Sequence, residues 1–287
     1  THCISSAASD VYKRQAYAEN PFAMPLGRKV VEEDICEADV VIYVISRISG
    51  EGKDRRKVKG DYYLSEREEE DLRYLAEMNK PVILILNAGG PVELTDILEQ
   101  TDNIKGILNI SQLGQEGGDA LADVLLGKEV PGGKLTTTWA RRYEDYPASE
   151  EYGYLNGNLE KEKYKEGIYV GYRYFDSFDK KVMFPFGFGL SYTMFEMKCC
   201  SINMEESKIR AEVQVTNTGN EYAGKEVVQI YVTLPQTELE KEYKRLAGFA
   251  KTRLLKPGET QTLTVEIPQK QLASFNEETH TLSLIHI

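Results

Sequence analysis

A glutamate between two glycines is the residue whose surroundings most suggest chemistry. Glu51 lies in a glycine-flanked stretch that also carries Arg47, Asp54 and Arg55. Flanking glycines let the backbone take conformations that other residues resist, and a carboxyl group can donate or accept a proton. From residue types alone, two interpretations are equally supported: a general acid or base at Glu51, and an exposed glutamate paired with a basic neighbour.

Other kinds of site are poorly supported. The histidines lie near the chain ends, at His2, His280 and His286, where a catalytic base would be poorly held. The four cysteines show no Cys-x-x-Cys spacing, which disfavours zinc and indicates free thiols in a reducing, cytoplasmic location. The formal charge of −11 disfavours nucleic acid and anionic membranes. We therefore expect no metal, no cofactor, no nucleic-acid partner and no membrane partner.

The first half of the chain alternates strands and helices. Apolar runs predict strands buried on both faces at 40–45 and 82–86, with a third strand at 106–110. Helices are predicted at 30–37, 65–78, 93–100 and 117–126, and Ser65 with Glu68 forms a capping box. This alternation predicts a parallel sheet with helices on both faces. Glu51 then follows the carboxyl end of the first strand, where ligands bind in such sheets.

The later part of the chain has a different pattern. Residues 139–183 show little periodicity apart from an aromatic run at 169–175. This whole segment is either a long surface loop that covers a sheet edge or a segment whose tyrosines line a sugar-binding cleft. Trp139 is either a packed residue or a sugar-stacking platform. After residue 193 the apolar residues recur with period two, at 209–216, 228–234 and 262–267. Such strands without intervening helices predict an antiparallel sandwich.

Several motifs in the same order resemble glycoside hydrolase family 3, the β-glucosidase family. They lie at 49–55, 59–61, 114–118, 131–135, 169–174, 186–193, 215–219 and 224–231. The resemblance implies an α/β parallel-sheet sandwich domain at 16–193 and an all-β fibronectin type III-like (immunoglobulin-like) sandwich at 194–287, in agreement with the patterns above. It also implies a TIM-barrel domain of the same polypeptide, before or after this chain. We expect both domains to be truncated, and residues 1–15 and 282–287 to be non-native ends.

The resemblance also implies a reaction. Glu51 would be the general acid/base of a retaining β-glycosidase, most simply a β-glucosidase, acting on a β-glucoside or oligosaccharide. The nucleophile would come from the absent barrel, so we expect this chain alone to be inactive. Arg47, Asp54 and Arg55 are candidate substrate contacts, with ion pairing inside the loop as the alternative. The basic neighbours should favour the charged form of Glu51. The alternative function is a non-catalytic carbohydrate-binding or interaction module.

Overall fold

The chain forms two compact units. The computed structural model describes residues 28–48, 55–152, 160–161, 163–236 and 239–283. Unit 1 consists of Thr1–Leu126 and Ala140–Glu160, and unit 2 consists of Gly127–Trp139 and Lys161–Ile287. The domain limits predicted from the sequence pattern, with a division near residue 193, stay a prediction. Contacts group the chain differently, because residues 127–139 and 161–193 belong to the same unit as the later strands.

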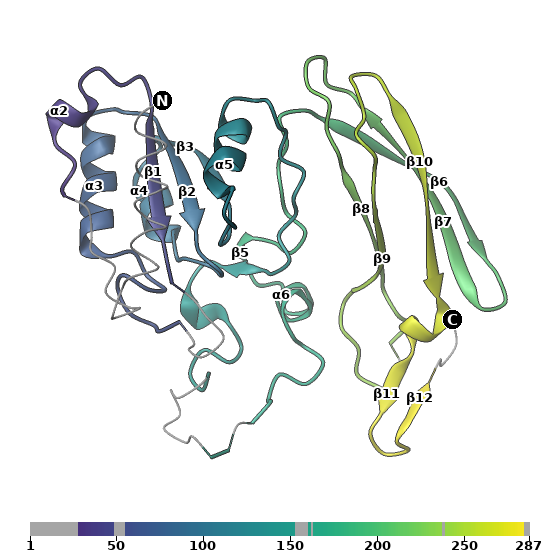
Figure 1. The fold of residues 1–287 in the computed structure, drawn as a ribbon. Helices are drawn as coiled ribbons and strands as arrows, with labels where there is room; N and C mark the ends of the chain where they lie inside the picture. Colours follow the sequence, from purple (N-terminus) through teal and green to yellow (C-terminus); the bar gives the residue numbers. More distant parts are fainter. Residues whose placement is uncertain (1–27, 49–54, 153–159, 162, 237–238, 284–287) are drawn as a thin grey trace. The chain divides into compact units, whose positions relative to one another are not determined.

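Unit 1 is built on a parallel sheet of strands in the order β1-β2-β3 (Figure 1). The strands are β1 (Val41–Ser46), β2 (Val82–Asn87) and β3 (Ile104–Asn109). The register of the first pair runs from Val41 opposite Val82 to Ser46 opposite Asn87. The predicted parallel sheet is confirmed, with strand ends displaced by one or two residues from the apolar runs.

The strands of this sheet differ in burial. Five of the six residues of β2 are buried, as predicted for a strand covered on both faces. Within β1, by contrast, Ile45 is the buried residue and the others are partly exposed, while Val40 just before it is 46% exposed. The prediction of a fully buried first strand is wrong. The physical reason is that β2 has a strand on each side, whereas β1 pairs only with β2 among the described residues.

Helices follow each strand of the sheet. They are α3 (Glu66–Glu77), α4 (Thr95–Gln100) and α5 (Gly117–Leu125), with α2 (Glu32–Ile35) before β1 and a 3₁₀ turn η1 (Tyr143–Asp145) later. Figure 1 shows α3 and α5 on opposite sides of the strands. The predicted capping box starts α3: Ser65 Oγ accepts the Glu68 N–H, and the Glu68 carboxylate accepts the Ser65 N–H. Leu72 and Leu75, on the inner face of α3, are fully buried.

Unit 2 is dominated by antiparallel strands. They are β6 (Phe195–Met204), β7 (Lys208–Asn217), β8 (Val227–Val232), β9 (Arg245–Lys251), β10 (Thr260–Pro268), β11 (Ser274–Asn276) and β12 (Thr281–Ser283), with a 3₁₀ turn η3 (Gln269–Leu272). One sheet has the order β10-β7-β6, and β8 pairs with β9. In β7, Ala211, Val213 and Val215 are buried and alternate with partly exposed residues. The period-two prediction of an all-β sandwich is confirmed.

Segments that precede β6 pack against these strands within unit 2. The short elements before β6 are β4 (Trp139–Ala140), whose Trp139 belongs to unit 2 and whose Ala140 belongs to unit 1, α6 (Tyr172–Ser177) and β5 (Val182–Phe184). The Tyr172 hydroxyl accepts the N–H of Leu246 in β9 at 2.7 Å. Lys134 forms an ion pair with Glu226 at 2.8 Å. The aromatic run at 169–175 is thus partly helical and contacts β9; both interpretations of residues 139–183, the surface loop that covers a sheet edge and the sugar-binding cleft, stay predictions.

Asn217, at the end of β7, is expected to stabilise unit 2. Its side chain is fully buried and makes four hydrogen bonds: to the carbonyls of Tyr222 and Leu255, from the Thr193 hydroxyl and from the Gly219 N–H. An Asn217→Leu substitution should lower the free energy of unfolding by about 2–3 kcal/mol, because buried polar groups lose their partners. Urea denaturation measures this. The exposed Asn203→Leu is the control, and equal losses in both variants would contradict the prediction.

No helix among the described residues is both long and apolar enough to cross a membrane. Of the residues expected to be non-native at the carboxyl end, Leu282 and Ser283 lie in β12, which pairs with β11. The residues from 284 onward, and residues 1–15, lie outside the described part of the chain.

Candidate active site

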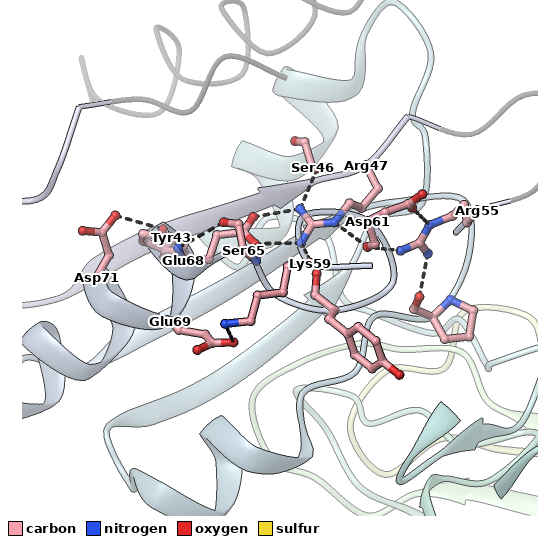
Figure 2. Close-up of polar contacts among 12 residues, drawn as sticks. Tyr43, Ser46, Arg47, Arg55, Lys59, Asp61, Ser65, Glu68, Glu69 and Asp71 are labelled. Carbon is pink, nitrogen blue, oxygen red and sulfur yellow. Dashed lines mark hydrogen bonds and ion pairs between the residues drawn. The ribbon is translucent and has the colours of Figure 1, made fainter. Parts of the chain in front are cut away.

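The predicted acid loop leaves the carboxyl end of β1. Residues 49–54 lie outside the described residues, so the predictions for Glu51 and Asp54 are not tested by the geometry. The two remaining predicted site residues, Arg47 and Arg55, are described and flank this segment on either side. Their contacts define how the ends of the segment are held (Figure 2).

Arg47 is a buried arginine that uses every N–H bond of its side chain. Its guanidinium donates to both carboxylate oxygens of Glu68, each at 2.7 Å. The other three N–H bonds reach backbone carbonyls: Ser46 at 2.9 Å, Asp61 at 2.7 Å and Tyr63 at 3.2 Å. Arg47 is 4% exposed. Because all five donors are occupied, the geometry does not favour a contact between Arg47 and a sugar hydroxyl.

Glu68 ties this arginine to helix α3. Its Oε2 atom accepts both the Arg47 Nη2–H and the Ser65 N–H, each at 2.7 Å. Ser65 precedes the first residue of α3, so one carboxylate closes the amino-terminal cap of the helix and also neutralises Arg47. A bidentate arginine–carboxylate pair fixes orientation as well as distance. The guanidinium plane of Arg47 is therefore set by the start of α3.

Asp61 accepts hydrogen bonds from residues on both sides of the segment 49–54. Its carbonyl oxygen accepts N–H bonds from Arg47 and Arg55, and its carboxylate accepts the Arg55 Nε–H at 2.9 Å and the Arg56 backbone N–H at 2.7 Å. Arg55 also donates to the Pro91 carbonyl at 2.6 Å. Burial lowers the pKa of Arg55, and the hydrogen bond and charge of Asp61 oppose that shift. The residues before and after the segment 49–54 thus meet at one carbonyl group.

These contacts change the electrostatic surroundings expected for Glu51. Arg47 is paired with the buried Glu68, and Arg55 is paired with the buried Asp61. The expectation that basic neighbours favour the charged form of Glu51 rested on the number of basic residues near it in the sequence. Since each positive charge is balanced by a buried carboxylate within 3 Å, these two residues lower the energy of a charged Glu51 less than their number suggests.

A second layer of contacts holds the returning chain. Tyr62 packs edge-on against Tyr143, with ring centroids 4.9 Å apart. Lys57 forms an ion pair with Glu144 and lies over the Tyr143 ring at 4.8 Å. Burial raises the pKa of Tyr63 to about 12. The segment that follows the predicted acid loop is therefore attached to η1 by packing and by charge.

The sequence interpretation identified some of these residues but not their partners. It placed Glu68 in a capping box with Ser65, and this placement is confirmed. It missed that Asp61 and Glu68 neutralise the two arginines. The signal was present only in part: buried arginines need carboxylate partners, but several acidic residues between 61 and 71 could have served.

Two other candidates can be placed. Trp139 is 3% exposed and packs against Phe184 at 5.9 Å between ring centroids, as expected for a packed residue rather than a sugar platform. Cys36, Cys199 and Cys200 are free thiols. Among the residues that the structure describes, no group of three or more His, Cys, Asp or Glu side chains is placed to hold a metal ion.

The two parts of the chain match known protein domains. Residues 15–192 match the glycosyl hydrolase family 3 C-terminal domain, and residues 226–284 match a fibronectin type III-like domain. The first match covers more than half of the chain, so the chain belongs to glycosyl hydrolase family 3. This confirms the resemblance and the fold class expected from the sequence: a parallel α/β domain followed by an all-β domain.

The chain is similar to several β-glucosidases. Beta-glucosidase A of Butyrivibrio fibrisolvens is 38% identical over 88% of this chain and 35% of its own length. Among solved structures, β-glucosidase 3B from Thermotoga neapolitana in complex with glucose has a TM-score of 0.81 and 40% identity, over 95% of this chain and 39% of that chain. A β-glucosidase from Paenibacillus barengoltzii has a TM-score of 0.85 and 34% identity, over 95% of this chain and 30% of its own. This chain thus spans 30–39% of the length of these proteins.

Proposed function

We propose that this chain is part of a retaining β-glycosidase, most simply a β-glucosidase, and that Glu51 is its general acid/base. Family membership and the names of the relatives support the reaction class. The observation that supports the assignment of the residue is the arrangement on either side of its segment: the segment with Glu51 follows β1 in the sequence, and the flanking residues Arg47 and Arg55 both donate to the Asp61 carbonyl. The sequence Gly50-Glu51-Gly52 favours this function over a binding module, which has no need of an acidic residue between two glycines.

The proposed reaction has two steps. In the first, the Glu51 carboxyl group gives its proton to the glycosidic oxygen while a second carboxylate attacks the anomeric carbon, so the leaving alcohol departs and a glycosyl ester forms. In the second, the Glu51 carboxylate takes a proton from water, whose oxygen displaces the ester and releases the sugar. The attacking carboxylate would be an aspartate of a TIM-barrel domain in the same polypeptide. This chain alone is then expected to be inactive.

The geometry distinguishes Arg47 from Arg55 as a predicted substrate contact. The Arg47 side chain is fully engaged within the protein, whereas the Arg55 side chain is 12% exposed and lies next to the segment 49–54. We assign the contact with sugar hydroxyls to Arg55 and Asp54. A terminal β-linked glucoside is the proposed substrate, because the relatives are named as β-glucosidases.

The stereochemistry of the product tests the reaction class. In the longer protein that carries this chain, hydrolysis of a methyl β-glucoside followed by proton NMR should show the β-anomer of glucose first, because two displacements restore the starting configuration. An initial α-anomer would contradict the proposal. Binding of the glucoside without any hydrolysis would support the alternative, a non-catalytic carbohydrate-binding or interaction module.

A further inference from the structure

We propose that Glu68 is a positioning residue for the acid/base of this enzyme, acting through Arg47. The inference rests on the proposed role of Glu51. It assigns to a helix-capping glutamate a part in catalysis that its place on α3 would not suggest. The described contacts of Glu68 are with Arg47 and Ser65, so its proposed effect is on the described residues that precede and follow the segment 49–54.

A single guanidinium group joins three parts of the chain. Arg47 donates to the end of β1 through the Ser46 carbonyl, to the returning chain through the Asp61 and Tyr63 carbonyls, and to α3 through Glu68 (Figure 2). The backbone N–H of Arg47 also donates to the Asn87 carbonyl at the end of β2, at 2.9 Å. The position of this guanidinium therefore sets the exit and the return of the loop together.

Glu68 sets the orientation of that guanidinium. Two parallel N–H bonds of 2.7 Å hold the plane of the Arg47 side chain, whereas each backbone carbonyl accepts a single bond. A planar fork bound at two points cannot rotate without breaking one of them. Glu68 is itself held by its place in the first turn of α3 and by the Ser65 N–H. The start of α3 thus fixes the orientation of the Arg47 guanidinium.

A small displacement of a general acid has a large effect on the reaction rate. In the sequence, Glu51 is three residues after Ile48 and four before Arg55, so a shift of either anchor reaches it through few bonds. A general acid must lie about 2.6–3.2 Å from the atom that it protonates. A displacement of about 1 Å can lower a rate about 100-fold.

Glu68→Gln in the longer protein tests the inference. Glu68 accepts three N–H bonds with its two oxygens. A glutamine amide must turn its NH₂ group toward one of these donors, which frees the orientation of Arg47. We expect kcat/KM for methyl β-glucoside, whose leaving group needs a proton, to fall about 10–100-fold. For 2,4-dinitrophenyl β-glucoside, whose leaving group needs none, the fall should be less than about 3-fold.

Asp71→Asn is the matched control, because it lies on the same helix at similar burial. Asp71 is 3% exposed and Glu68 is 6% exposed. Asp71 accepts hydrogen bonds from the Tyr43 hydroxyl and the Val30 N–H, each at 3.2 Å, instead of holding Arg47. The Asp71→Asn substitution should change kcat/KM for both substrates by the same factor. A merely structural role of Glu68 would give the same equal loss, and that result would overturn the inference.

Two further variants keep the outcome interpretable. Glu68→Asp retains the charge and shortens the side chain, so it serves if the glutamine variant does not fold; it should show the same selective loss for the methyl glucoside. Glu51→Gln should show that selective loss more strongly. If Glu51→Gln lacks it, the proposed function fails. If Glu51→Gln shows it and both Glu68 variants match Asp71→Asn, the positioning role alone fails.

Discussion

In the proposed enzyme with its TIM-barrel domain, replacing Glu51 by glutamine should lower kcat/KM for methyl β-glucoside by about 10²–10⁴-fold. Positioned proton transfer contributes a factor of this size, and glutamine has nearly the same shape but no acidic proton. For 2,4-dinitrophenyl β-glucoside, kcat/KM should change less than about 10-fold, because this leaving group departs as a stable anion. Its kcat should nevertheless fall, since the second step needs Glu51 as a base.

Rapid-mixing measurements with the dinitrophenyl substrate should then show a burst of released phenol followed by slow turnover. Glu66→Gln is the control, because Glu66 is an exposed glutamate at the start of α3 that pairs loosely with Lys59; its kinetics should match those of the unchanged enzyme. A Glu51→Gln variant that hydrolyses methyl β-glucoside at the original rate would place the general acid elsewhere in the protein.

Arg47→Met should lower the free energy of unfolding by about 3–5 kcal/mol, the usual result of removing one partner from a buried ion pair. Methionine leaves the Glu68 carboxylate, which is 8% exposed at its side chain, without its counter-charge. It also removes the donors to the carbonyls of Ser46, Asp61 and Tyr63. Urea denaturation followed by circular dichroism measures the loss. Fluorescence of Trp139, which belongs to unit 2, measures the unfolding of that unit separately.

The double variant Arg47→Met with Glu68→Leu separates charge from packing. Replacing both members of a buried pair by apolar residues is often close to neutral, so the double variant should recover much of the stability that the single variant loses. It should not recover all of it, because the Ser65 N–H loses its acceptor at the start of α3. A double variant that loses the sum of the two single effects would show that the ion pair is not the source of the loss.

The paired arginines also bear on how the proposed acid is kept active. A general acid works best when its pKa is raised toward the working pH, and unpaired cations beside Glu51 would oppose this. Two of the basic residues near Glu51 in the sequence are paired, since Glu68 neutralises Arg47 and Asp61 neutralises Arg55. Arg47 and Arg55 can therefore bind the Asp61 carbonyl without being two uncompensated positive charges.

Local patterns in the sequence were sufficient for most of the fold. The capping box at Ser65 predicted the start of α3 because capping depends on residues three positions apart, and the alternation in β7 predicted its buried face because side chains in a strand alternate between faces. The parallel arrangement followed from strands separated by helices. The predicted burial of β1 failed because burial depends on which strands lie beside it, and an apolar run does not contain that information.

The sequence by itself determined the class of the protein, the glycine-flanked glutamate as the candidate acid and the presence of two arginines near it. Only the tertiary structure decided what those arginines do. The contacts of Arg47 with Glu68 and of Arg55 with Pro91 join residues 21 and 36 positions apart, and no short-range rule selects one carboxylate or carbonyl among many. The same holds for Tyr172 and Leu246, 74 positions apart. Such pairings arise because a compact fold must give each buried charge or N–H group a partner, and the partner is whichever group the fold brings within reach.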